Sequence, residues 1–168
     1  VQHGGGEGSG YTFRRGNTCT VLTADHVVQH DGLPAADLTV LDRPGAKAPG
    51  EVVYSNPVYD LALVALPDDT DVACTAPWPD AGALAGSTLS SSTRFDVVRH
   101  YPDGREALVL LSYAGGTPQE LALAPVDRTS IRESDSGSIV MLDGQPAGIV
   151  LRVRTAHGRV GALRFDQI

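Results

Sequence analysis

Hydrophobic and polar residues alternate with a period of two along most of the chain, and no segment sustains the spacing of an amphipathic helix. Turn-forming residues separate the alternating runs, as in PDG at 102–104, DG at 143–144 and HG at 157–158. One helical turn is expected just after His26. The alternation predicts strands at 10–13, 18–23, 37–42, 50–55, 61–66, 93–100, 106–112, 120–124, 138–142, 147–154 and 160–165.

Short strands at this spacing predict an all-β protein, either a barrel or a sandwich. The composition changes between residues 76 and 92, where PWP leads into a stretch rich in Gly, Ala, Ser and Thr. Two prolines this close together do not fit inside a central strand. We therefore expect a connection here between two lobes, residues 1–80 and residues 81–168.

Composition limits the range of functions. The chain has 168 residues, of which 42% are hydrophobic, so it can build the core of one domain or of two small lobes. Its formal charge of −7 argues against nucleic acid as the main partner, because phosphate binding needs clustered basic residues. No hydrophobic run reaches the roughly 18–20 residues that span a bilayer. No residue spacing indicates a metal site, and we expect no cofactor.

The two cysteines, Cys19 and Cys74, leave two interpretations open. A disulfide between them would close a 55-residue loop, worth about 3–4 kcal/mol, and would indicate an oxidising compartment, secreted or periplasmic. The alternative is two buried free thiols in a cytoplasmic protein.

Three residue types needed for nucleophilic catalysis stand near predicted strand ends, in the order His26, Asp60, Ser136. A serine hydroxyl is a weak nucleophile until a base removes its proton, and the base works only when a third group orients its ring. The sequence therefore indicates a catalytic triad. An α/β-hydrolase is excluded, because the Gly-x-Ser-x-Gly elbow is absent and the order of the three residues differs.

Four segments resemble the chymotrypsin-like (trypsin-like) serine peptidases, particularly the bacterial glutamyl-endopeptidase and HtrA-type branches. They are GSGYTF at 8–13, VLTADHVV at 21–28, DLALV at 60–64, and DSGS at 135–138 followed by AGIV at 147–150. The resemblance implies two antiparallel six-stranded β-barrels with the active site in the cleft between them. It also implies a serine endopeptidase in which His26 is the general base, Asp60 orients it and Ser136 forms the acyl-enzyme.

The same resemblance assigns the oxyanion hole to the backbone N–H groups of Ser134 and Ser136. The family has glycine where this chain has Ser134, and two consequences stay open. The serine either holds its peptide the other way round, so that substrate or a partner has to complete the hole, or adopts the required conformation at about 1–3 kcal/mol of strain.

Two further carboxylates flank the candidate residues. In the trypsin-like branch, the carboxylate equivalent to Asp135 pairs with an N-terminal amine. This chain begins VQHG, which does not resemble the usual IVGG start, so we expect Asp135 to bind local backbone or a basic side chain instead of Val1. Asp25 precedes the histidine, and we expect it to be an exposed carboxylate without a catalytic role.

By resemblance, the substrate pocket is lined by Ser130 and Ile131 on one side and by Leu151, Arg152 and Val153 on the other. The absence of an acid at Ser130 argues against a preference for Lys or Arg, and the branched Val153 narrows the opening. We expect small aliphatic residues before the scissile bond of a polypeptide substrate, whose backbone pairs with the strand at 151–153.

A second class of function competes with the enzyme. A protease fold with an impaired oxyanion hole would serve as a peptide-binding or interaction module, an interpretation that Ser134 motivates and the intact triad opposes. We expect the chain to be a module of a longer protein, and flanking regulatory domains or an activating partner would be compatible with either function.

Overall fold

The computed structural model describes residues 1–4, 6–42, 45–74, 76, 78, 84, 87–101, 103, 105–127, 131–154 and 158–168. The chain divides into two compact units, Val1–Trp78 and Pro79–Ile168, which are described separately here. All strand pairs found in the described residues are antiparallel. The all-β class predicted from the alternation is confirmed. Within the same residues, no helix has the length and apolar character needed to cross a membrane.

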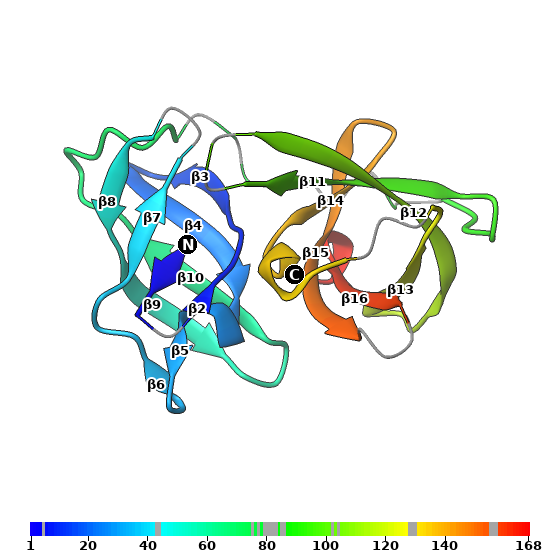
Figure 1. The fold of residues 1–168 in the computed structure, drawn as a ribbon, viewed down its shortest axis with the longest axis horizontal. Coiled ribbons are helices and arrows are strands. Elements are labelled where there is room, and N and C mark those ends of the chain that lie inside the picture. Colours follow the sequence, from blue (N-terminus) through cyan, green and yellow to red (C-terminus); the bar gives the residue numbers. More distant parts are fainter. Residues whose placement is uncertain are drawn as a thin grey trace. The chain divides into compact units, whose positions relative to one another are not determined.

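The first unit contains two four-stranded sheets and a two-stranded ribbon (Figure 1). One sheet has the order β3-β4-β10-β9, formed by Tyr11–Arg15, Thr18–Ala24, Leu61–Ala65 and Glu51–Asn56. The other has the order β2-β1-β7-β8, formed by Gly6–Glu7, Gln2–His3, Thr39–Leu41 and Lys47–Pro49. The ribbon pairs β5 (Gln29–His30) with β6 (Leu33–Pro34). The strands of this unit thus pair as separate sheets, where the resemblance implied one six-stranded barrel.

Strand β4 is the centre of the first sheet and fixes its register. It is buried at every position from Cys19 to Ala24, which the nearly continuous apolar run of that segment explains. Burying one Val or Leu side chain contributes about 1.5–3 kcal/mol. Antiparallel pairing with β10 sets Ala24 opposite Leu61, so the end of one strand lies beside the start of the other.

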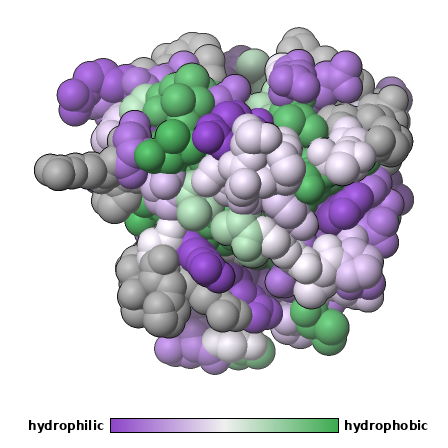
Figure 2. All heavy atoms as spheres, turned by 90° about the vertical axis from the view of Figure 1, so that its right-hand side faces the viewer, coloured by the Kyte–Doolittle hydropathy of each residue, from purple (hydrophilic) through white to green (hydrophobic). Residues whose placement is uncertain are grey.

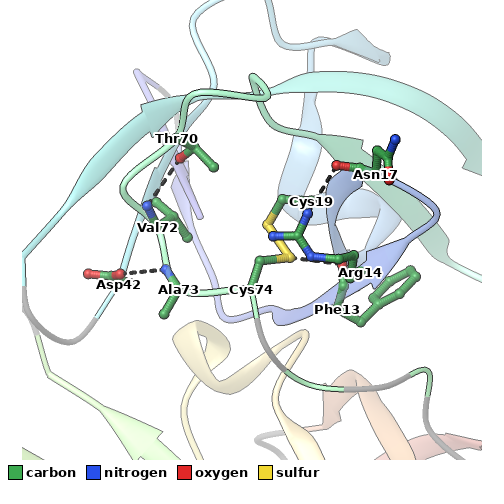
Figure 3. The surroundings of a disulfide bond; sticks show 9 residues. All are labelled: Phe13, Arg14, Asn17, Cys19, Asp42, Thr70, Val72, Ala73 and Cys74. Atoms are coloured by element: carbon green, nitrogen blue, oxygen red, sulfur yellow. Dashed lines mark hydrogen bonds between the residues drawn. A yellow bond between two sulfur atoms is a disulfide. The ribbon is translucent and has the colours of Figure 1, made fainter.

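A disulfide joins Cys19 of β4 to Cys74, with their Cα atoms 5.7 Å apart (Figure 3). The segment before Cys74 is held by its backbone, because the N–H of Ala73 donates to the carboxylate of Asp42 at 2.9 Å. The aromatic ring of Phe13 packs edge-on against Trp78, with the ring centroids 4.8 Å apart. Of the two interpretations left open by the sequence, the structure contains the disulfide.

The second unit is a closed six-stranded barrel with the order β11-β12-β13-β16-β15-β14 (Figure 1). Alternating side chains of its strands fill the interior, and Phe95, Val97, Val109 and Leu111 are completely buried there. This barrel was predicted and is confirmed. In chain order its strands are Arg94–His100, Glu106–Gly116, Glu120–Pro125, Ile139–Leu142, Gln145–Arg154 and Arg159–Arg164.

The tight turn between β14 and β15 lies where the sequence predicted it. Asp143 and Gly144 join β14 to β15 with φ values of 51° and 78°, the left-handed pair that a two-residue hairpin requires. The predicted turns at 102–104 and 157–158 lie between paired strands, although residues 102, 104 and 157 are outside the described residues.

Each of the eleven predicted strands has an observed counterpart, whereas the short strands β1, β2, β5, β6 and β8 were not predicted. The expected helical turn is η1, a 3-10 helix at Asp25–Val28 that contains the histidine itself. On the face drawn in Figure 2, hydrophobic and hydrophilic side chains are interspersed among the coloured residues.

Candidate active site

The candidate base and its carboxylate come from adjoining strand ends in the first unit. His26 lies in η1, directly after β4 ends at Ala24. Asp60 directly precedes β10, whose first residue Leu61 pairs with Ala24. Segments 34 residues apart in the sequence are therefore brought together by the register of one strand pair. The structure places His26 and Asp60 in contact.

The carboxylate of Asp60 holds His26 at both its backbone and its ring. One oxygen accepts the backbone N–H of His26 at 3.0 Å, and the two oxygens lie 3.0 and 2.9 Å from Nδ1. With Nδ1 donating to a carboxylate, the proton-accepting role is left to Nε2. The Asp60 side chain is 13% exposed and the His26 side chain 50%, so the pair has a buried orienting end and an accessible reactive end.

The backbone of Asp60 is itself unusual. Its φ of 52° is in the left-handed region, which Asp and Asn tolerate better than other residues with a side chain. In this conformation its carbonyl accepts the N–H of Asp25 at 3.0 Å while its carboxylate turns back to His26. Asp60 thus fixes two consecutive residues of η1.

The expectation that Asp25 is exposed is wrong. It is only 4% exposed, and its carboxylate accepts a hydrogen bond from Nε2 of Gln29 at 3.3 Å. The same amide nitrogen of Gln29 lies 3.2 Å from the hydroxyl of Ser55 in β9. Asp25 is buried because η1 folds back against the sheet, and it connects the histidine turn to a neighbouring strand.

The candidate nucleophile, Ser136, belongs to the second unit. It follows η3, a 3-10 turn at Glu133–Asp135, and precedes β14. Gly137 has a φ of 85°, which explains the glycine, and donates its N–H to the carbonyl of Val150 at 2.7 Å. The N–H of Val150 in turn donates to the carbonyl of Ser138 at 2.8 Å. These bonds attach the serine segment to β15.

Asp135 is bound by a basic side chain and by local backbone, as expected. Its carboxylate accepts two hydrogen bonds from Arg99, at 2.8 and 2.6 Å, and one from the backbone N–H of Arg132 at 2.8 Å. Arg99 is 4% exposed and Asp135 only 1%. The terminal amine of Val1 instead donates to the carbonyl of Gly8 at 2.8 Å, and its burial lowers its pKa to about 6.

Sequence reasoning missed Arg99, although the signal was present. In β11 the buried positions alternate as Phe95, Val97 and Arg99, so the period of two assigns the arginine to the barrel interior. A charged group in such a position needs a partner of opposite charge. The hydrogen bonds to Asp135 raise the pKa of the Arg99 guanidinium further above its ordinary value.

The backbone N–H assigned to the oxyanion hole at Ser136 is engaged within the turn. It donates to the carbonyl of Glu133 at 3.0 Å, the hydrogen bond that closes η3. Ser134 lies inside the same turn and is half-buried. In this structure, therefore, the carbonyl of Glu133 occupies the Ser136 N–H, the donor that the family resemblance assigns to the oxyanion hole.

The expected pocket residues differ in exposure. Ile131 is 7% exposed and belongs to the barrel core, Leu151 is 2% exposed, and Arg152 is exposed. Val153 is half-buried and packs against the core. Ser130 lies outside the described residues. Among the strands described, none pairs with the β14 side of β15 beyond Val150.

This fold and these segments define the class of trypsin-like peptidase domains. The chain belongs to that family, which matches residues 8–167 as the trypsin-like peptidase domain. The resemblance found in the sequence is therefore confirmed.

Many solved structures share the fold, and 382 chains match. One is described as "HtrA-type protease AlgW with decapeptide", with a TM-score of 0.72 and 16% identity, over 95% of this chain and 48% of that one. At this identity the likeness shows the fold alone, and this chain spans about half the length of that structure. No curated protein sequence matches the chain.

Proposed function

We propose that this domain is a serine endopeptidase that works through an acyl-enzyme, with Ser136 as nucleophile, His26 as general base and Asp60 as its orienting carboxylate. The observation that carries the proposal is the contact of Asp60 with Nδ1 of His26 at 2.9 Å, in a pair whose ring is half exposed. A buried carboxylate that fixes one ring nitrogen prepares the other to accept a proton.

In the proposed reaction, Nε2 of His26 removes the proton of the Ser136 hydroxyl while Oγ attacks the carbonyl carbon of the scissile peptide. The resulting tetrahedral oxyanion collapses, the C–N bond breaks, and Nε2 returns its proton to the leaving amine. Water, deprotonated by Nε2 of His26, then attacks the acyl carbon. The bond from that carbon to Oγ of Ser136 breaks, His26 returns the proton to Oγ, and the acid and the free serine are released. Asp60 stays ionised and stabilises the imidazolium in both halves.

The oxyanion step requires a change in the turn before the serine. The N–H of Ser136 has to exchange the carbonyl of Glu133 for the substrate oxygen, and the N–H of Ser134 has to turn toward the same point. We propose that substrate, or an activating partner, drives this change at the peptide between Glu133 and Ser134. Each donor of an oxyanion hole is worth about 2.7–4 kcal/mol of barrier, so the exchange is favourable in the transition state, where the oxyanion forms.

The substrate we propose is an extended polypeptide. The β14 side of β15 beyond Val150 offers an edge on which a peptide backbone can add as a strand, with Leu151, Arg152 and Val153 along it. The HtrA-type structure was solved with a decapeptide, which is in keeping with a peptide ligand. Val153 favours a small aliphatic residue before the scissile bond. The Cys19–Cys74 disulfide favours a secreted or periplasmic location.

A second candidate is a peptide-binding module without turnover, which the occupied Ser136 N–H favours. A fluorophosphonate probe that modifies activated serines separates the two. We expect labelling of the folded wild type and none of Ser136→Ala, with His26→Ala labelling at least about a hundredfold more slowly. If folded wild type stays unlabelled, with or without a peptide substrate, the enzyme proposal fails and the binding module is the better assignment.

A further inference from the structure

Arg99 and Asp135 form a buried ion pair in the second unit, with the guanidinium fork facing the carboxylate through Nε–Oδ1 at 2.8 Å and Nη2–Oδ2 at 2.6 Å. The side chains are 4% and 1% exposed. Two parallel hydrogen bonds fix the plane and the direction of the carboxylate, which a single point charge would not do. Arg99 therefore determines where the Asp135 oxygens lie.

The oriented carboxylate in turn fixes the segment that precedes the candidate nucleophile. Oδ2 of Asp135 accepts the N–H of Arg132 at 2.8 Å, while the N–H of Asp135 donates to the carbonyl of Arg132 at 3.0 Å. These two bonds join the ends of the turn in both directions. Ser136 is the next residue, so its position also depends on these two hydrogen bonds.

Arg99 is anchored in a rigid element. It lies in β11 and pairs with Ala107 of β12 in the wall of the closed barrel. Groups held by sheet strands keep their positions better than groups held by loops alone. The ion pair thus connects the turn before Ser136 to β11, in addition to the hydrogen bonds that attach Gly137 and Ser138 to β15.

Tyr101, one residue beyond β11, contacts both sides of this connection. Its ring lies 5.8 Å from the Cζ atom of Arg132 and 5.3 Å from that of Arg105, and its hydroxyl contributes, after Asp135, to raising the pKa of Arg99. Guanidinium groups within about 6 Å of a ring centroid are attracted to its face. Tyr101 is half-buried.

We propose that Arg99 is a positioning residue for the reaction. Through Asp135 it holds the backbone of the turn at residues 132–135, called the nucleophile turn because Ser136 follows it. The rearrangement of this turn is thereby confined to the peptide between Glu133 and Ser134. The inference rests on the proposed function for its catalytic consequence. Its structural consequence, a turn whose backbone order depends on Arg99, is independent of catalysis and is measured separately.

The test uses Arg99→Lys, which keeps the charge and loses the fork, with Arg94→Lys as the matched control. Arg94 lies on the same strand, but its side chain is exposed and donates to the backbone carbonyl of Ser91. We expect Arg99→Lys to lower the maximal rate of fluorophosphonate labelling by at least about tenfold while the half-saturating probe concentration stays within about twofold. The control should match the wild type.

Amide hydrogen exchange gives a readout that needs no activity. The N–H of Arg132 donates to Asp135, and in the wild type it should exchange as slowly as the N–H of Val97 in β11. In Arg99→Lys, the N–H of Arg132 should exchange at least about tenfold faster than in the wild type. The exchange rate of Val97 should not change. Rapid exchange at Arg132 in the wild type would overturn the proposal even if the variant did not fold. So would a folded Arg99→Lys that labels and exchanges like the wild type. If the wild type fails to label but shows the expected exchange rates, the proposed enzyme activity is refuted, and the proposed dependence of the turn on Arg99 is supported.

Discussion

Replacing Asp60 by asparagine and, separately, by alanine distinguishes what this residue does for folding from what it does for His26. Asparagine tolerates the left-handed backbone at φ 52°, and its side-chain oxygen can still accept the N–H of His26. Its side chain, however, is uncharged and carries an N–H donor as well as an oxygen, so it does not hold the proton on Nδ1 in the way that a carboxylate acceptor does. The ring then turns to the tautomer that places its proton on Nε2, where the base has to be free.

The expected magnitudes follow from these contacts. Asp60→Ala loses a hydrogen bond to a charged acceptor, worth about 1.5–3 kcal/mol, and places alanine in a left-handed conformation at about 1–2 kcal/mol. Its free energy of unfolding should therefore fall by about 2.5–5 kcal/mol. Asp60→Asn largely keeps the hydrogen bond to the His26 N–H and tolerates the left-handed backbone. Its free energy of unfolding should therefore fall by less than about 1.5 kcal/mol.

Both variants should lose about four orders of magnitude in labelling rate, the size of effect known for the wrong tautomer in a triad. Urea unfolding followed by tryptophan fluorescence gives the stabilities, and probe labelling gives the rates. If Asp60→Asn retained more than about a tenth of the wild-type rate, the orienting role would be refuted. Equal stability of the two variants would refute the account of the Asp60 backbone.

Three further perturbations test the fold around the site. Replacing Cys19 and Cys74 together by alanine should lower the free energy of unfolding by about 4 kcal/mol, because the disulfide closes a 55-residue loop, and reductant should then have no further effect on urea unfolding. Ser138→Ala should leave stability unchanged or raise it by about 1–2 kcal/mol in the same assay, because the buried Ser138 hydroxyl has no hydrogen-bond partner among the described residues. The hydrogen bond from Arg164 lowers the pKa of Asp166, so this pair stabilises the fold above the ordinary carboxyl pKa of 3.8 and stops doing so as the pH falls below it. A pH series of unfolding should show wild type and Asp166→Asn converging at acidic pH, and parallel curves would contradict this.

The sequence was sufficient where the determining signal is local. A period of two identifies strands of five or more residues, and the apolar run of β4 identifies a strand buried on both faces. The candidate base and carboxylate were found because strand ends carry them, and the Ala24–Leu61 register then brings them together. Two-residue strands such as β1 and β2 have no periodicity, since they exist only through their pairing with other segments.

The sequence was insufficient where burial reverses the usual preference of a residue. Asp25 was expected to be exposed because carboxylates usually are, yet η1 folds it against β9 through Gln29. Arg99 occupies an inward position that alternation assigns to an apolar residue, and only the position of Asp135 in three dimensions explains it. Side-chain patterns do not reveal backbone hydrogen bonds, so the sequence left the direction of the Ser134 peptide open and gave no sign that the Ser136 N–H donates to Glu133.

In the nucleophile turn at residues 132–135, the two ends are hydrogen-bonded to each other, and under the proposed reaction one peptide group turns, between Glu133 and Ser134. Arg132 and Asp135 are bonded in both directions, whereas the Ser136 N–H is held by the carbonyl of Glu133 alone. Under the proposed reaction that bond has to break, at about 0.5–1.5 kcal/mol, and the strain at Ser134 adds about 1–3 kcal/mol. At 1.4 kcal/mol per factor of ten, the formed oxyanion hole would be populated in roughly one molecule in ten to one in a thousand. The two hydrogen bonds to the oxyanion contribute more than the cost of forming the hole. The hydrogen bond that engages the Ser136 N–H in the free protein therefore lowers the rate of such an enzyme but does not abolish its activity.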